Sequence, residues 1–265
     1  MVTPRWKRRS PMTLQQFLPA NAFAVMLIFS RVGTAMMLLP GFGEFYVMQR
    51  YRLMLAMSLA LLLAPLLGPM LPPLPSGAGS LVAIVSTEAV IGLFLGLVSR
   101  ILLAATDIAG TVVSLQLGLS AAQIFNPMAA APGTLTSTLY GVLGVLLIFL
   151  TDLHHVLLRA IVDSYNVFPP GVMPPIGDLS EMITRSVAGC FLIGMEMSAP
   201  FILLGMVYFV SVGLVSRLVP QLQILFVTQP LQILGGLFTL GLVLAAGMQW
   251  FLEAFARQFA ALTGL

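Results

Sequence analysis

The sequence is poor in charge and nearly free of cysteine. Charged residues make up 8% of the 265 positions, whereas 59% are hydrophobic, and the mean hydropathy is +1.03. So few polar side chains cannot coat a water-soluble core, and the composition therefore indicates an integral membrane protein. Because the sequence has a single cysteine, Cys190, it allows neither an intramolecular disulfide nor a cysteine-rich metal site.

The sequence also lacks the motifs of common enzymes. It contains neither a GxxxxGK[ST] phosphate loop nor an HExxH metal pair. The stretch "GLSAA" at Gly118 lacks the second glycine of a nucleophile elbow, and no supporting base can be nominated for Ser120. The two histidines, His154 and His155, are adjacent, so we do not expect them to face the same way on a helix. The sequence predicts no enzyme, no cofactor and no metal site.

Basic residues are concentrated at the N-terminus. Four of them between positions 5 and 9 account for most of the net charge of +3, because the remaining chain carries eight basic residues against nine acidic ones. This is not the pattern of a nucleic-acid-binding protein. Close to an apolar segment, it favours a cytoplasmic N-terminus. Met12 opens a natural-looking start, which makes residues 1–11 a candidate N-terminal extension.

Apolar stretches along the chain have room for about six helical passes of about 20 residues each. A further helix start is expected at Ser180, a plausible N-cap. We expect the main helical blocks, separated by proline- and glycine-rich breaks, at 17–39, 53–71, 81–125, 135–162, 186–215 and 218–252.

Two of these blocks are too long for one pass. Residues 81–125 would measure about 68 Å as one straight helix, which is over twice a hydrocarbon core of about 30 Å. Either a hairpin is hidden there, or much of the helix packs against protein outside lipid. Residues 218–252 carry no charge and are divided by Pro220, Pro230 and the pair Gly235-Gly236, which favours a helical hairpin or a kinked pair.

Small residues recur at intervals of four. Gly92 and Gly96 form a GxxxG pair, and Gly110, Ser114 and Gly118 continue the same spacing. Such spacing allows two helices to approach closely. It predicts either packing within the chain or an interface with another subunit.

Ionisable residues inside the apolar blocks are the main candidates for a functional or structural role. In lipid each would cost about 2.5 to 3.5 kcal/mol, so each should face water, a partner or an opposite charge. Three interpretations stay open: structural ion pairs and snorkelling helix ends, the proton or ion relay of a transporter, and contacts with partner subunits. The six residues are Arg31, Glu88, Arg100, Asp107, Glu196 and Arg217.

Three stretches together resemble the FliR family of flagellar type III export, called SctT in injectisomes. The first is "SRVGTAMMLLPGFGEFYVMQRYRLMLAMSLALLLAP" at Ser30 to Pro65, and the second is "AGTVVSLQLGLSAAQIFNP" at Ala109 to Pro127. The third, "GLVSRLVPQLQILFVTQPLQILGGL" at Gly213 to Leu237, contains the specific pattern R-x-x-P-Q-L followed by a second proline. Their order and spacing agree with the family, and the resemblance covers about Leu14 to Trp250.

The resemblance implies an all-α integral membrane protein whose long, kinked helical hairpins pack in a conical export-gate assembly. The chain would be one subunit over 1–265, with a FliP-like part at 14–215 and a FliQ-like hairpin at 216–252. The implied partners are FliP, FliQ, FlhB and FlhA, together with membrane lipid. Unfolded flagellar proteins would pass through the pore of this assembly in the bacterial inner membrane, at the flagellar basal body.

The resemblance also implies a plug that closes the pore just after the G-L-S motif. This chain has Ala121 and Ile124 where relatives often place aromatic residues, and Phe125 follows one step later. The plug residues implied by position are Ser120, Ala121, Ala122, Gln123, Ile124, Phe125, Asn126 and Pro127.

Two alternatives remain at this point. Buried charges and broken helices are also found in secondary transporters and channels, although no internal repeat is visible in this sequence. The injectisome homologue of the same family would differ in its cargo and not in its physics.

Overall fold

The computed structural model describes residues 14–120, 133–218 and 224–263, and within these ranges the chain is helical and contains no strand. The predicted all-α class is therefore confirmed. The elements are α1 (Leu14–Leu38), α2 (Gln49–Leu67), the short 3-10 helix η1 (Gly68–Met70), α3 (Ala78–Gln116), α5 (Leu135–Leu150), α6 (Leu153–Val167), α7 (Ile176–Leu218) and α8 (Ile224–Thr263).

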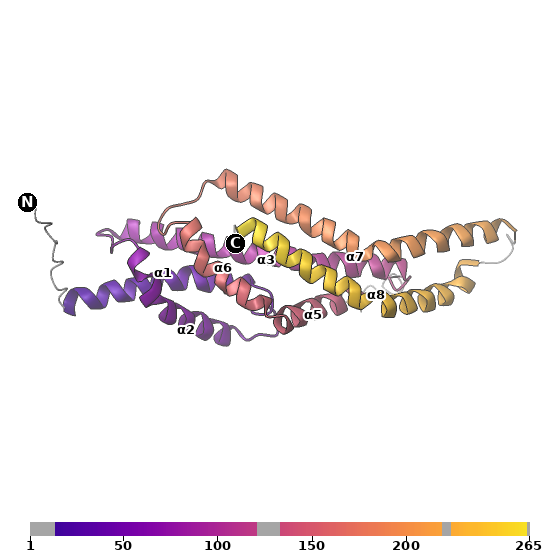
Figure 1. Ribbon diagram of the computed structural model, residues 1–265, viewed down its shortest axis with the longest axis horizontal. Helices are drawn as coiled ribbons and strands as arrows, with labels where there is room; N and C mark the ends of the chain where they lie inside the picture. The colour runs from indigo at the N-terminus through magenta and orange to yellow at the C-terminus, as the bar shows by residue number, and fades with distance from the viewer. Residues whose placement is uncertain (1–13, 121–132, 219–223, 264–265) are drawn as a thin grey trace, which may run out of the picture.

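Helix α3 is the central element of an elongated molecule (Figure 1). Its most extensive contacts are with α1, α7 and α5. The hairpin considered for residues 81–125 is wrong, because α3 is a single helix of 39 residues that ends at Gln116. At 1.5 Å per residue it is about 58 Å long, twice the thickness of a hydrocarbon core of about 30 Å.

The predicted block at 135–162 is two helices and not one. Asp152 separates α5 from α6, and its φ of 59° places this residue in the left-handed region. The two helices bend by 74° at this break. Asp is among the few residues that enter the left-handed region at modest cost. The break therefore needs neither proline nor glycine, and no conventional signal marks it in the sequence.

Helices α7 and α8 form a long hairpin, and both differ from the expected boundaries. Ser180 is no N-cap, because α7 has already begun at Ile176 and the Ser180 hydroxyl donates to the Gly177 carbonyl at 2.7 Å. Helix α8 continues through Pro230 and the Gly235-Gly236 pair without interruption. A hairpin contained within 218–252 is therefore wrong, while the division into FliP-like and FliQ-like parts stays a prediction.

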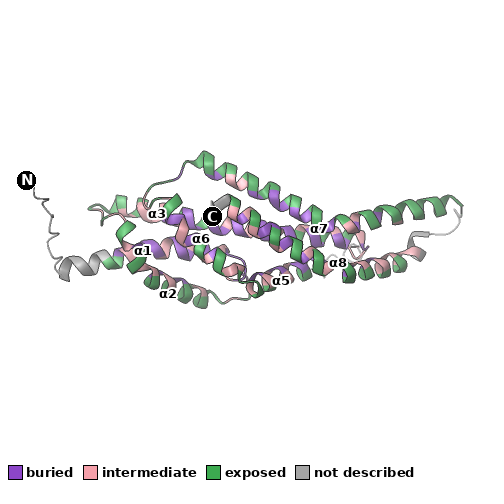
Figure 2. Cartoon of the chain, in the orientation of Figure 1, coloured by how far each residue is buried: buried purple, intermediate pink, exposed green. Residues whose placement is uncertain are grey.

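Among the described residues, five helices are long and apolar enough to cross a membrane, and the bent pair α5–α6 would make a sixth crossing if it acts as one span. This agrees with the expected number of passes. The apolar surface is not confined to one band, however. Figure 2 shows exposed residues along α2 and along the part of the α7–α8 hairpin that extends beyond the rest of the molecule. Exposed apolar areas of this extent need lipid or protein to cover them.

The small-residue spacing is explained by packing inside the chain. A side chain at Gly92 would overlap the backbone carbonyl of Arg31, and a Cβ at Gly96 would lie 2.6 Å from the Ala35 carbonyl oxygen. Gly110 meets the backbone of Ser137 on α5 in the same way. The three glycines thus let α3 touch the backbones of α1 and α5, which confirms the interpretation as intrachain packing.

The α1–α3 contact generates a first prediction. Gly92→Ala should force the two backbones apart and lower the free energy of unfolding by about 1–3 kcal/mol, the usual cost of overpacking. Gly79→Ala is the matched control, because it lies on the same helix with no atom within 4 Å of the added Cβ. Thermal unfolding of the two purified variants in detergent measures the difference. Equal stability of both variants would contradict the close α1–α3 approach.

Candidate functional site

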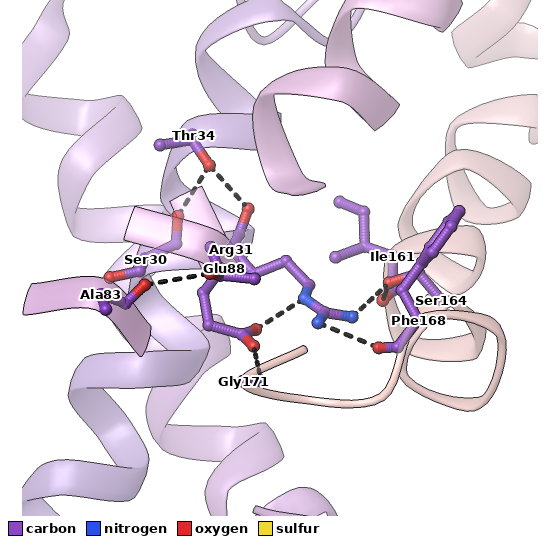
Figure 3. Close-up of polar contacts among 10 residues, drawn as sticks. Ser30, Arg31, Thr34, Ala83, Glu88, Ile161, Ser164, Phe168 and Gly171 are labelled. Carbon is purple, nitrogen blue, oxygen red and sulfur yellow. Dashed lines mark hydrogen bonds and ion pairs between the residues drawn. The ribbon is translucent and has the colours of Figure 1, made fainter. Parts of the chain in front are cut away.

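The largest fully buried side chain among the described residues is that of Arg31 on α1 (Figure 3). Its Nε donates to Oε2 of Glu88 on α3 at 2.8 Å, and both side chains are 0% exposed. Its remaining nitrogens donate to the Ser164 hydroxyl at 3.1 Å and to the Phe168 carbonyl at 3.2 Å. The predicted internal pairing is thus found for Arg31 and Glu88.

The Glu88 carboxylate and the ring of Tyr165 complete this network. The second carboxylate oxygen, Oε1, accepts the Gly171 backbone N–H at 3.0 Å. The Arg31 guanidinium carbon lies 3.9 Å from the centre of the Tyr165 ring, a cation–π contact. The buried guanidinium thus has a counter-charge, three hydrogen-bond acceptors and a ring face, which offset the cost of burying it. The Tyr165 hydroxyl itself has no hydrogen-bond partner among the described residues. The network links α1 and α3 to the end of α6 and to the proline-rich loop, and it fixes the positions of these elements relative to one another.

A second ion pair lies at a pocket between α3, α5 and the loop that follows α1. Arg100 on α3 pairs with Glu44 of the loop. Both residues and Asp107 line a pocket of about 230 Å³. Glu44 was missed by the sequence analysis, because it lies in a connection that had been read only as a polar turn. Burial, and then the nearby Glu44 carboxylate, raise the pKa of Tyr46, which lines the same pocket.

The two remaining candidate charges are not brought together. Glu196 is exposed on α7 and lines a pocket with Trp250 and Arg257 of α8. Arg217 is exposed near the end of α7. Glu196 and Arg217 are therefore roughly six turns, or about 30 Å, apart on one helix, which excludes an ion pair between them within the chain.

Of the predicted plug, the structure describes Ser120, and residues 121–127 lie outside the described residues. The Ser120 hydroxyl donates to the Ser114 hydroxyl at 3.2 Å. Residues 116–118, just before Ser120, contact α8. Gln232 of α8 donates its side-chain amide to the Gln116 carbonyl at 2.8 Å, and Gly118 adopts a φ of 74° beside the same amide.

Two glycines make room for this turn. A Cβ at Gly236 of α8 would lie 2.5 Å from Leu117, and a side chain at Gly205 of α7 would overlap the amide of Gln116. The turn at 116–118 is therefore enclosed by α7 and α8. Uncharged amides in an otherwise apolar sequence were the signal for this contact, but the sequence alone did not connect Gln116 with Gln232.

The other flank of the predicted plug is held by hydrogen bonds at Thr134. Thr134 caps α5 by exchanging hydrogen bonds with Ser137, an N-terminal capping box. The Thr134 hydroxyl also reaches the Gly110 carbonyl at 3.5 Å. Both flanks of the predicted plug are thus fixed to the last turns of α3.

The histidines lie differently from the expectation. The ring centres of His154 and His155 are 4.0 Å apart, and their possible ligand atoms lie within 4.8 Å of each other and of Asp152. Both histidines lie in the first turn of α6, which begins at Leu153, directly after the left-handed Asp152. The positive end of the α6 dipole lies at this point and disfavours a cation.

Comparison with known proteins agrees with these features. The family described as "Bacterial export proteins, family 1" matches residues 22–258. A protein of Caulobacter vibrioides named flagellar biosynthetic protein FliR is 39% identical over 235 residues, which cover 87% of this chain and 94% of that protein. The chain belongs to the FliR family of bacterial export proteins.

More distant relatives carry the same name. The FliR protein of Bacillus subtilis is 32% identical over 149 residues, or 55% of this chain and 58% of that protein. The FliR protein of Escherichia coli is 28% identical over 171 residues, or 64% of each chain. The family is one of export proteins and not a known class of enzyme. The resemblance read from the three sequence stretches is confirmed, and the chain is a membrane protein of flagellar biosynthesis.

The Arg31 network generates a second prediction. Arg31→Leu should lower the free energy of unfolding by about 3–5 kcal/mol, because it leaves the Glu88 carboxylate buried without its counter-charge. The double variant Arg31→Leu with Glu88→Leu should recover part of that loss. Thermal unfolding in detergent measures both.

Arg185→Leu is the control, because Arg185 pairs with Glu181 on the surface, where the two side chains are 70% and 62% exposed. Its loss should stay below about 1 kcal/mol. If the Arg31→Leu variant were no less stable than the Arg185→Leu variant, the network would not hold α1 to α3.

Proposed function

We propose that this chain is a core subunit of the flagellar type III protein export gate. With FliP and FliQ it forms the closed pore through which unfolded flagellar proteins leave the cell. It lies in the inner membrane at the flagellar basal body, next to FlhB and FlhA. The observation that carries this proposal is the family match over residues 22–258.

The helix lengths support a place inside an assembly. Helices α3, α7 and α8 contain 39, 43 and 40 residues, or roughly 60 Å each. A bilayer covers about 30 Å of a helix that runs along its normal. Irregular or polar segments at membrane depth are tolerated where protein surrounds them, so neighbouring subunits account for helices of this length.

The charges that suggested a transporter favour the export subunit. Arg31 and Glu88 engage each other and fixed groups of α6 and the following loop, and an ion relay needs a partner that can exchange. The flagellar names of the relatives favour the flagellar system over the injectisome as the setting of this chain.

The plug is part of the same proposal. Residues Ser120 to Pro127 would cross the lumen, and Ile124 and Phe125 would resist wetting of the closed pore. Support comes from the family resemblance and from the two flanks, where Gln232 holds Gln116 and Thr134 reaches Gly110. A constriction held at both flanks can open and close while its base stays in place.

Co-purification tests the assembly. Extraction in mild detergent should yield the affinity-tagged chain together with FliP and FliQ in one particle, because the exposed faces of α2, α7 and α8 would then be covered. Size-exclusion chromatography with mass spectrometry of the peak measures this, and an unrelated inner-membrane protein with the same tag is the control. Recovery of the tagged chain without FliP and FliQ from cells that express all three would argue against the proposal.

Ion conductance tests the plug. Deletion of residues 120–126 should leave assembly largely intact, because the contacts of Gln116 and Thr134 remain, but it should make the membrane leak ions. Conductance of the purified complex in planar bilayers measures the leak. Gly247→Ala, where the added Cβ meets no atom within 4 Å, is the control for preparation and insertion. Unchanged conductance on deletion would remove the gating role.

A further inference from the structure

The pocket between α3, α5 and the loop after α1 carries an excess negative charge. Its ionisable lining consists of the carboxylates of Glu44 and Asp107 and the guanidinium of Arg100, apart from the neutral phenol of Tyr46. Arg100 is engaged with Glu44. Asp107 makes no hydrogen bond or ion pair with the described part of the chain, and its side chain is exposed.

The hydroxyl groups around Asp107 are already used. Thr106 donates to the Leu103 carbonyl at 2.8 Å, and Ser137 and Thr138 both donate to the Thr134 carbonyl, at 2.9 and 3.1 Å. None of these three residues of the pocket lining therefore offers its proton to the carboxylate. Asp107 thus receives no hydrogen bond from these hydroxyl groups, and the cation of the pocket lining, Arg100, is paired with Glu44.

The geometry beside Asp107 leaves space for an incoming group. Gly141 of α5 lies next to it: an added Cβ would lie 3.5 Å from the carboxylate oxygen Oδ1, in van der Waals contact, so the glycine leaves this side of the carboxylate uncovered. The pocket volume of about 230 Å³ is smaller than the roughly 300–1,000 Å³ of small-molecule sites. It suits the end of one long side chain better than a free ligand.

The surface of α5 beside this pocket has the pattern of a helix-packing face. Its exposed large apolar residues follow one another at intervals of four, three, four and four, and Val142 among them also lines the pocket. This is the spacing that packs against another helix. The residues are Leu135, Leu139, Val142, Leu146 and Leu150.

We propose that a helix of a neighbouring subunit lies along this stripe of α5 and inserts a Lys or Arg side chain into the pocket, where it pairs with Asp107. The inference rests on the proposed function, because it needs neighbouring subunits. A carboxylate in an apolar surface is costly to cover with lipid, and a cationic side chain offsets this cost. The apolar stripe gives the partner its affinity, and Asp107 fixes its register.

The test is recovery of neighbouring subunits with tagged Asp107 variants. Asp107→Asn should reduce the recovered neighbours several-fold, and Asp107→Lys should reduce them further, because it places two cations together. The Asp107→Lys chain is then produced together with variants of each subunit that the wild-type chain recovers. In each of these variants, one Lys or Arg is replaced by Glu. One such replacement should restore recovery.

Two controls separate this effect from misfolding. Asp163→Asn removes a carboxylate that already pairs with Arg159 of its own helix at 3.6 Å, and it should leave recovery unchanged. The isolated Asp107→Asn chain should unfold at the wild-type temperature, because Asp107 has no bond to lose within the described structure.

The outcomes distinguish the two levels of the argument. If both Asp107 variants recover neighbouring subunits as the wild-type chain does, the inference alone is overturned. The same holds if recovery is reduced and no charge reversal in a partner restores it. Asp107 then faces lipid or solvent. A lowered unfolding temperature of the isolated Asp107→Asn chain also overturns it. If the wild-type chain recovers no neighbouring subunit, the proposed function fails together with the inference.

Discussion

The structure depends on one buried charge. At 0% exposure, the guanidinium of Arg31 is stable only where several groups remain in fixed positions around it. Glu88 and Gly92 lie one turn apart on α3. The Glu88 carboxylate accepts a hydrogen bond from the Arg31 guanidinium, and the missing side chain of Gly92 leaves room for the Arg31 carbonyl. Side chain and backbone of a single residue therefore set how α1 lies on α3, and α3 in turn contacts α5 and α7.

Much of the fold could be predicted from the sequence, because apolar length and proline content decide where helices run. The prediction failed where one residue type had two possible roles. Pro230 and the Gly235-Gly236 pair were expected to divide a helix, yet α8 continues, and Gly236 serves to admit Leu117. The break that does occur, at Asp152, uses a left-handed conformation that composition does not reveal.

The candidate charges show the same limit. Their expected cost in lipid identified Arg31 and Glu88, but their pairing spans 57 residues and follows from tertiary packing. Glu44 escaped notice because the rule for costly charges applies to apolar segments, and Glu44 lies in a turn. The contact between Gln116 and Gln232 escaped for a related reason: amides in an apolar sequence call for hydrogen-bond partners, but the sequence does not show which two meet across 116 residues.

Lipid alone cannot cover this chain. Exposed large apolar residues recur on α7 from Val187 to Leu218, a stretch of about 46 Å along the helix. To hide that length within about 30 Å of hydrocarbon, the helix would have to tilt by roughly 50°, beyond the usual range of about 0–40°. Neighbouring α8 is of similar length and adds its own exposed leucines, such as Leu231 and Leu242. This length of exposed apolar surface supports the proposal that neighbouring subunits pack against part of the hairpin.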